Sequence, residues 1–467
     1  MYRAVLSVML LASVGTSRAP GQRPASRARL IAVADSLAKH ELATGPTAGL
    51  AIAVWQRGRL VLARGYGYAN LEDRIPITAA TVFNLGSVTK QFTATAILQL
   101  AEQRKLSLDD ELTKYVPELP LPGHRVTLLR LLNHTSGIKN FTEIGGAVDD
   151  SLQLDLPPER VIRLFEHEPF DFEPGTDWLY NNSAFWLLGL VVERASGESY
   201  GDYLSRHIFA PLGMRSSSFC RDRTFAPPRA RGYERTPSGL ANLIGESVAV
   251  AFSSGGLCSS VLDLVTFRRA LGSGRLISKA SYRRMIEPTA LPNGWRTNYG
   301  FGLARYRLGR AEVIRHGGSI GGFQANLMYV PEVDLVVAAL ANTAGADPVG
   351  VSDRIATAAM GLPLPILSDR PLEPQVAARV AGRYRLGGLD VDVLEKGAEL
   401  EVRRPGYPAA ARLVWQGGSK FIARGGGVFG YYGYEPVLDI PIGEARITRF
   451  RFETASGEWL TALRMER

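Results

Sequence analysis

The 467-residue chain contains only two cysteines, Cys220 and Cys258, and neither has metal-ligand spacing to a histidine or to the other cysteine. No HExxH motif occurs, so the sequence indicates neither a bound metal nor a cofactor. No stretch reaches about 18 uninterrupted apolar residues, so no stable membrane span is expected. The net charge of +9 is spread over interleaved acidic and basic residues, which argues against a nucleic-acid partner.

The N-terminus has the pattern of an export signal. Met1-Tyr2-Arg3 supplies a positive charge, Ala4–Val14 is apolar, and small residues follow. This pattern predicts a signal peptide over about residues 1–19 and an exported protein, periplasmic or secreted. In an oxidising compartment the two cysteines could form a disulfide, although two buried unpaired thiols are equally compatible with the sequence.

The hydrophobic periodicity predicts strands at both ends of a helical middle section. Because strands so far apart in sequence can close one sheet, the pattern favours an α/β or α+β domain. Helical patterns cover 28–42, 90–103, 127–133, 158–167, 184–195 and 261–271, and strand patterns cover 50–68, 299–308, 312–315, 323–329 and 334–340.

The C-terminal part has a different composition. Residues 363–375 are rich in proline and form a predicted linker. From 376 to 467 short alternating runs such as Leu389-Asp390-Val391-Asp392-Val393 predict a small all-β accessory domain, a barrel or a sandwich.

The strongest candidate for chemistry is Ser87, in the sequence Gly86-Ser87-Val88-Thr89-Lys90 at a predicted helix start. Residues i and i+3 share a helix face, so Lys90 can take or relay the hydroxyl proton. At a helix N-terminus the backbone N–H of the serine can also stabilise an oxyanion. Ser136-Gly137-Ile138-Lys139 is a second Ser-x-x-Lys match, but a loop context with glycine next to the serine disfavours it.

Two further elements supply possible partners for Ser87. Tyr180-Asn181-Asn182 stands in a predicted loop before a helix, where a nearby ammonium such as Lys90 would favour the phenolate of Tyr180. His316-Gly317-Gly318-Ser319 follows a predicted strand, and its glycines would let a substrate backbone approach closely. The backbone N–H of Ser319 could then complete an oxyanion hole begun by Ser87.

With these elements in order, residues 28–362 resemble the serine β-lactamase and penicillin-binding-protein superfamily, in particular its class C β-lactamase-related branch. Ser-x-x-Lys, Tyr-x-Asn and His-x-Gly occur in the family's order, and several family-like phrases surround them. These phrases are Leu131–Ile138, Pro211–Met214, Ser254–Leu257 and Tyr299–Gly302. Class C β-lactamases usually have lysine at the position of His316, whereas DD-peptidases and D-aminopeptidases of the superfamily can have histidine, and related esterases also vary there.

The resemblance implies a β-lactamase-like antiparallel sheet with flanking helices and a helical subdomain, followed here by the small β domain. It implies a Ser87 acyl-enzyme acting on esters, amides or D-amino-acid peptides, with at most weak β-lactam hydrolysis. Ser87, Lys90 and Tyr180 would be catalytic, and Asn182, His316, Gly318 and Ser319 would bind the substrate. The expected partner is a small molecule or peptide, such as a peptidoglycan fragment.

Three alternatives remain at this point. Gly317-Gly318-Ser319-Ile320-Gly321 matches the Gly-x-Ser-x-Gly nucleophile elbow, but no histidine follows Ser319 to serve as its base. Gly425–Gly430 matches a dinucleotide fingerprint without a following helix pattern and is better explained as a hairpin turn. The third alternative is a non-catalytic receptor for penicillin or cell-wall peptides that is acylated and does not turn over.

Overall fold

A computed structural model describes residues 25–44, 47–145, 153–220, 228–243, 247–362, 370–386, 389–397, 399–405, 410–424, 437–444, 446–454 and 459–465. The predicted signal peptide, most of the predicted linker and the glycine-rich 425–430 segment lie outside these residues. Within the described residues, no helix combines the length and apolar character that crossing a membrane requires.

The larger part of the chain is built on one seven-stranded antiparallel sheet in the order β3-β2-β1-β12-β11-β10-β9. Strands from the two ends of this part pair at its centre, with Leu50 of β1 opposite Ala341 of β12. The expectation of one sheet closed by distant segments is confirmed. The strands are β1 (Gly49–Gln56), β2 (Arg59–Asn70), β3 (Ile75–Pro76), β9 (Ala304–Leu308), β10 (Ala311–Ile320), β11 (Phe323–Val330) and β12 (Leu335–Ala341).

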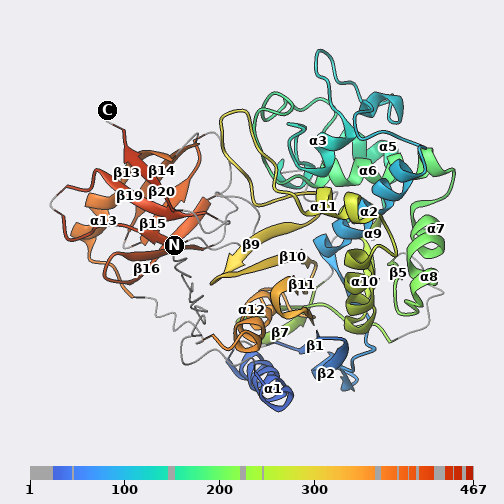
Figure 1. The fold of residues 1–467 in the computed structure, drawn as a ribbon, viewed down its shortest axis with the longest axis horizontal. Coiled ribbons are helices and arrows are strands. Elements are labelled where there is room, and N and C mark those ends of the chain that lie inside the picture. Colours follow the sequence, from blue (N-terminus) through green and yellow to red (C-terminus); the bar gives the residue numbers. More distant parts are fainter. Residues whose placement is uncertain are drawn as a thin grey trace, which may run out of the picture.

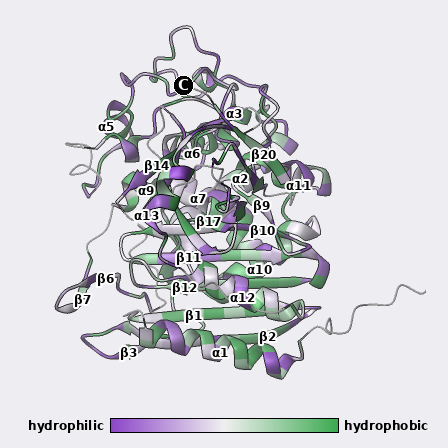
Figure 2. Ribbon diagram, turned by 90° about the vertical axis from the view of Figure 1, so that its left-hand side faces the viewer, coloured by the Kyte–Doolittle hydropathy of each residue, from purple (hydrophilic) through white to green (hydrophobic). Residues whose placement is uncertain are grey.

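Both faces of the central strands are buried, which explains why β12 is apolar throughout and β1 has a single polar side chain, Gln56, at its end. Alternate residues point to opposite faces. Leu50 and Ile52 join a cluster with helices α1 (Arg27–Thr44) and α12 (Pro348–Ala359), whereas Ala51 and Ala53 join the core on the helical side. In Figure 2, β1 is coloured as hydrophobic over most of its length and α1, beneath it, shows mixed colours.

The other face of the sheet carries the helical subdomain (Figure 1). The strands of this region are short: β4 (Phe83–Asn84), β5 (Ser218–Phe219), β6 (Tyr233–Thr236), β7 (Gly239–Asn242) and β8 (Leu257–Ser259). The helices are α2 (Thr89–Glu102), α3 (Leu128–Leu132), α5 (Pro158–Arg163), α6 (Asn182–Ser196), α7 (Tyr200–Leu204), α8 (Ala210–Leu212), α9 (Val248–Gly255), α10 (Val261–Ser273) and α11 (Lys279–Ile286). Single turns are η1 (Gly86–Val88), η2 (Leu112–Lys114), η3 (Phe141–Glu143), η4 (Ser205–Phe209, a π-helix) and η5 (Pro331–Val333).

Three local predictions were wrong in their boundaries. The strand expected from residue 299 begins at Ala304, because residues 299–303 form a turn that includes Gly302 at a φ of +66°. The helix expected over 158–167 ends at Arg163. His316–Ser319 does not follow a strand but lies inside β10 and pairs with β11.

The C-terminal part is a closed eight-stranded antiparallel barrel preceded by helix α13 (Pro374–Val380). Its interior contains apolar side chains from alternate strand positions, including Tyr384, Val391 and Phe452. The same cluster continues into Trp178 and Tyr299 of the larger part, so the barrel packs against it. The strands are β13 (Gly382–Leu386), β14 (Leu389–Lys396), β15 (Glu399–Arg403), β16 (Ala410–Gly417), β17 (Lys420–Arg424), β18 (Val437–Asp439), β19 (Arg449–Glu453) and β20 (Trp459–Arg464).

Cys220 and Cys258 form a disulfide. The bond joins the end of β5 to β8, next to the strand β4 that leads to Ser87. Of the two possibilities that the sequence left open, the structure has the paired one.

Candidate active site

Ser87 lies in the turn η1, immediately before α2, as the sequence predicted. Its side chain is partly exposed, whereas Lys90 on the first turn of α2 is fully buried. The Nζ atom of Lys90 donates a hydrogen bond of 3.1 Å to Ser87 Oγ. The i, i+3 spacing therefore places an amine against a hydroxyl that is open to a substrate.

Two acceptors from other elements fix the position of the Lys90 ammonium. It donates 2.7 Å to Asn182 Oδ1, at the start of α6, and 2.8 Å to the carbonyl oxygen of Ser254, at the end of α9. Asn182 is itself held, because its Nδ2 donates to Thr142 Oγ1 and its backbone N–H donates to Asn140 Oδ1. These hydrogen bonds hold the buried Nζ atom of Lys90 in one position, next to Ser87.

Tyr180 approaches the same lysine. Lys90 Nζ lies 4.8 Å from the centre of the Tyr180 ring and 5.6 Å from that of Phe185. Tyr180 is nearly buried, and the next residue, Asn181, caps α6 by accepting the N–H of Ala184 at 2.8 Å. The helix cap thus fixes the segment that presents Tyr180 and Asn182.

Strand β10 runs directly beside the turn that contains Ser87. A Cβ atom at Gly318 would lie 2.0 Å from the carbonyl oxygen of Leu85 and 3.0 Å from the amide nitrogen of Ser87. A Cβ atom at Gly86 would lie 2.8 Å from the amide nitrogen of Ser319. Glycine is therefore required on both segments, and the two amides expected to form an oxyanion hole lie on segments in direct contact.

His316 is fully buried in β10 and is held at both ring nitrogens. Its Nδ1 is 2.6 Å from the carbonyl oxygen of Gly317, which can only accept, so Nδ1 donates. Its Nε2 is 2.8 Å from the hydroxyl of Tyr299 and accepts from it. Burial, together with the charges of Lys90 and Arg315, holds the pKa of His316 well below its usual value, so the ring is neutral.

His134 is a second buried histidine at this place, and the motif analysis did not select it. Its Nδ1 accepts the N–H of Asn181 at 3.1 Å, and its ring centre is 4.6 Å from that of Tyr180 and 4.7 Å from that of Tyr299. Burial, and then the charge of Lys90, lower its pKa well below the usual value. His134 and Tyr299 thus form the wall behind Tyr180. Both residues occur in the family-like phrases Leu131–Ile138 and Tyr299–Gly302, and these phrases were the sequence feature from which their place in the site could have been predicted.

Neither of the two alternative serines, Ser136 and Ser319, has the surroundings of a catalytic nucleophile. Ser136 is 1% exposed, and Lys139 is paired with Asp171 at 2.8 Å rather than with the serine. Ser319 is exposed, but it lies in the β10–β11 hairpin rather than on the strand-to-helix turn of a nucleophile elbow, and its Oγ accepts from Gln324. Among the described residues, no three His, Cys, Asp or Glu side chains gather as a metal site would require.

The comparison with known families agrees with this arrangement. The family model described as Beta-lactamase matches residues 34–361, which include all seven candidate site residues. The chain belongs to the Beta-lactamase family. The barrel lies outside the part of the chain that this family model matches.

Similar proteins include a D-aminopeptidase, a penicillin-binding protein homologue and a D-stereospecific amidohydrolase. A D-aminopeptidase of Gluconobacter oxydans is 31% identical over 324 residues, covering 68% of this chain and 60% of that protein. An octameric penicillin-binding protein homologue from Pyrococcus abyssi has a TM-score of 0.66 at 25% identity, covering 92% of this chain and 99% of that one. A D-stereospecific amidohydrolase from Streptomyces sp. has a TM-score of 0.60 at 26% identity. The match covers 70% of this chain and 97% of that one. The matched segment spans about three fifths of the length of the first curated relatives.

Proposed function

We propose that the protein is a serine hydrolase that cleaves amides or short peptides of D-amino acids through an acyl-enzyme on Ser87. The observation that supports this most is the 3.1 Å contact between Lys90 Nζ and a partly exposed Ser87 Oγ. Relatives named D-aminopeptidase and D-stereospecific amidohydrolase support the substrate class.

In the acylation step, Lys90 together with Tyr180 takes the proton of the Ser87 hydroxyl as Oγ attacks the substrate carbonyl. Lys90 Nζ lies 4.8 Å from the centre of the Tyr180 ring, so the proton is assigned to the pair and not to either residue alone. The carbonyl oxygen becomes an oxyanion held by the backbone N–H groups of Ser87 and Ser319. The C–N bond then breaks, and the leaving amine receives the proton.

Deacylation repeats these steps with water as the nucleophile. Water near Tyr180 loses a proton to the same pair, attacks the ester carbonyl, and the Ser87 oxygen leaves with a proton. Asn182 holds Lys90 throughout and orients the amide of the substrate. His316 helps to position the substrate along β10, and the absence of a side chain at Gly318 lets this strand lie directly against the Ser87 turn.

The same site would accept activated esters and would hydrolyse β-lactams weakly, because a neutral histidine stands where class C β-lactamases have a cation. We also propose export through the leader at 1–19, to the periplasm or the medium. The disulfide between Cys220 and Cys258 supports this proposal, because disulfides persist in oxidising compartments.

A substrate panel tests the function. It consists of D-alanine and L-alanine p-nitroanilides, a D-Ala-D-Ala peptide, p-nitrophenyl acetate and nitrocefin, each with wild type and Ser87→Ala. The proposal predicts turnover of the D-amide that exceeds that of the L-amide and disappears in Ser87→Ala. Stable stoichiometric labelling by a fluorescent penicillin without turnover of any substrate would instead identify a receptor.

A further inference from the structure

A cavity of about 830 Å³ lies in the helical subdomain between α6, α7, α8, α9 and β5. None of the seven candidate site residues lines it. Its walls contain four aromatic side chains, Trp186, Phe209, Phe219 and Phe252. A cavity of this size with aromatic walls is suited to the apolar body of a small molecule.

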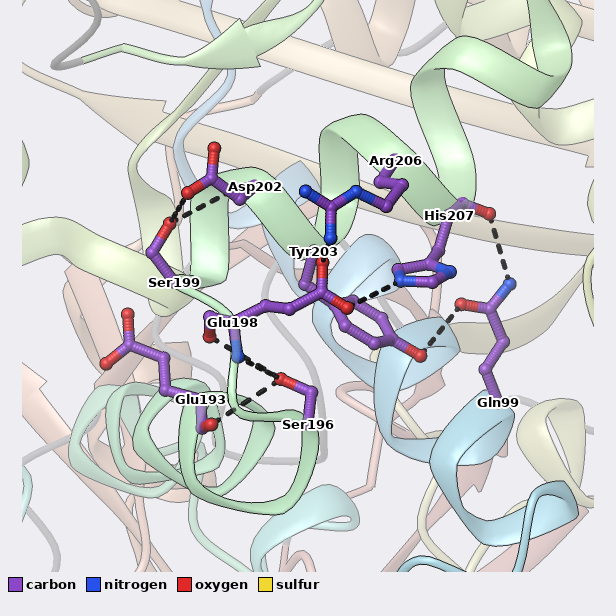
Figure 3. A network of polar contacts seen from close by, with 9 residues as sticks. All are labelled: Gln99, Glu193, Ser196, Glu198, Ser199, Asp202, Tyr203, Arg206 and His207. Carbon is purple, nitrogen blue, oxygen red and sulfur yellow. Dashed lines mark hydrogen bonds and ion pairs between the residues drawn. The ribbon is translucent and has the colours of Figure 1, made fainter.

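Among the described residues that line this cavity, three are charged. Glu193 and Asp202 contribute carboxylates, and Arg215, an exposed side chain, contributes a guanidinium. In Figure 3 the Glu193 carboxylate extends to the side of Ser199 and Asp202, whereas Glu198 extends the other way and pairs with Arg206 and His207. Burial raises the pKa of Glu193, so its charged form would gain from a cationic partner.

A chain of hydrogen bonds connects Glu193 to the helix that holds Lys90. The backbone N–H of Tyr200 donates 2.8 Å to Glu193 Oε1, and the Tyr200 hydroxyl lies 2.7 Å from Thr93 Oγ1. Thr93, one turn after Lys90 on α2, donates 2.7 Å to the carbonyl oxygen of Ser253. The acidic end of the cavity is thus tied to α2 and to α9.

Phe252 connects the cavity to Lys90 more directly. Its backbone has φ +35° and ψ −128°, a conformation that side-chain-bearing residues rarely adopt and that costs on the order of 1–3 kcal/mol. Its ring forms part of the cavity wall and packs against Trp186, with 5.5 Å between ring centres. Two residues later, the carbonyl of Ser254 accepts from Lys90. A shift of the Phe252 ring that moves its backbone as well would displace an acceptor of the catalytic amine.

We propose that this cavity binds a small organic cation, a primary amine on an apolar or aromatic body, and that its occupancy alters the activity of Lys90 through Phe252. The amine contacts Glu193, and the apolar body lies against the aromatic wall. The binding part stands on the cavity alone, whereas the effect on Lys90 rests on the proposed hydrolase function.

Binding is tested with 4-phenylbutylamine and, as a probe of the same length and opposite charge, 5-phenylpentanoate. The protein is the full chain with Ser87→Ala, so that no reaction interferes, and titration calorimetry measures affinity. We expect saturable binding of the amine and none of the acid. Absence of saturable amine binding, or equal binding of both probes, would overturn the proposal.

Variants locate the site. Glu193→Gln keeps an oxygen for the Tyr200 amide and should weaken amine binding about tenfold, the loss expected for a hydrogen bond to a charged group. Glu198→Gln is the matched control, since Glu198 does not line the cavity. This variant should bind 4-phenylbutylamine with the same affinity as the Ser87→Ala protein. Ser205→Phe, at an exposed lining position, should block binding. Equal losses in Glu193→Gln and Glu198→Gln would contradict the assignment.

The effect on Lys90 is tested with the wild-type protein and p-nitrophenyl acetate. Saturating 4-phenylbutylamine should change kcat/KM about fivefold or more, within the usual range of coupling between sites. Ser205→Phe should hydrolyse the ester without responding to the amine. Binding without any change in rate would overturn the coupling. If the wild-type protein hydrolyses nothing, the proposed function fails, whereas the calorimetric titration still decides whether the cavity binds amines.

Discussion

The hydroxyl of Tyr299 donates to Nε2 of His316 over 2.8 Å, and both side chains are fully buried beside Tyr180. A neutral imidazole is needed for this bond, because a protonated ring has no acceptor. The histidine that distinguishes this chain from class C β-lactamases is therefore built into the wall of the site by a partner of its own.

His316→Lys tests what this histidine contributes to substrate choice. Lysine cannot accept from Tyr299 and adds a cation that favours the carboxylate of a β-lactam. We expect the ratio of kcat/KM for nitrocefin to that for p-nitrophenyl acetate to rise about tenfold, a difference of about 1.4 kcal/mol between the two transition states. Equal losses on both substrates would show instead that His316 has a direct chemical or structural role.

The two buried histidines also predict a pH dependence of stability. The pKa values of His134 and His316 are lowered in the folded protein, so below about pH 6.5 the unfolded chain binds protons that the folded chain does not. The free energy of unfolding should therefore fall as the pH decreases from 7 to 5. Urea unfolding at several pH values measures this, and His316→Gln should reduce the slope. An unchanged slope would contradict this, because it would mean that His316 binds protons equally in the folded and the unfolded chain.

Gly318→Ala tests the contact between β10 and the Ser87 turn. The added methyl group would overlap the carbonyl oxygen of Leu85, so the strand must move away from η1 and carry the Ser319 amide with it. We expect kcat to fall on the order of a hundredfold, as for loss of one oxyanion-hole donor. Ser319→Ala is the control, because it keeps the backbone amide and should retain activity. Wild-type kcat in Gly318→Ala would rule out this contact as part of the site.

Arg404 tests how the barrel is attached to the catalytic part. Its guanidinium pairs with Asp177 and donates 3.3 Å to the carbonyl oxygen of Trp178, two residues before Tyr180. Both members of the pair are largely buried. A double-mutant cycle of Arg404→Ala and Asp177→Ala should give a coupling energy between about 1 and 3 kcal/mol by urea unfolding. A coupling energy near zero would show that the pair contributes nothing to docking.

The parts of the site that could be predicted depend on local geometry. Ser87 and Lys90 are three residues apart at a helix start, so their contact follows from helix geometry. The alternation in the C-terminal part likewise predicts strands, and their closure into one barrel fits that pattern. The order of the three motifs was enough to suggest which segments meet.

The rest depends on contacts between distant segments. The carbonyl of Ser254 accepts a hydrogen bond from Lys90, which is 164 residues away in sequence. A backbone acceptor cannot be predicted from a pattern of side chains. His134 contacts Tyr180 and Tyr299 only after the loops have folded together. His316–Ser319 was expected to follow a strand, yet it pairs with β11 as part of β10, and Gly318 lets that strand pass close to Leu85.

The central claim is that Ser87 is the nucleophile, and covalent labelling tests it most directly. The full chain is incubated with a fluorophosphonate, and intact-mass and peptide-mass spectrometry locate the adduct. We predict one adduct per molecule on the peptide that contains Ser87, retained in Ser136→Ala and Ser319→Ala and lost in Ser87→Ala. Stoichiometric labelling that persists in Ser87→Ala would contradict the account.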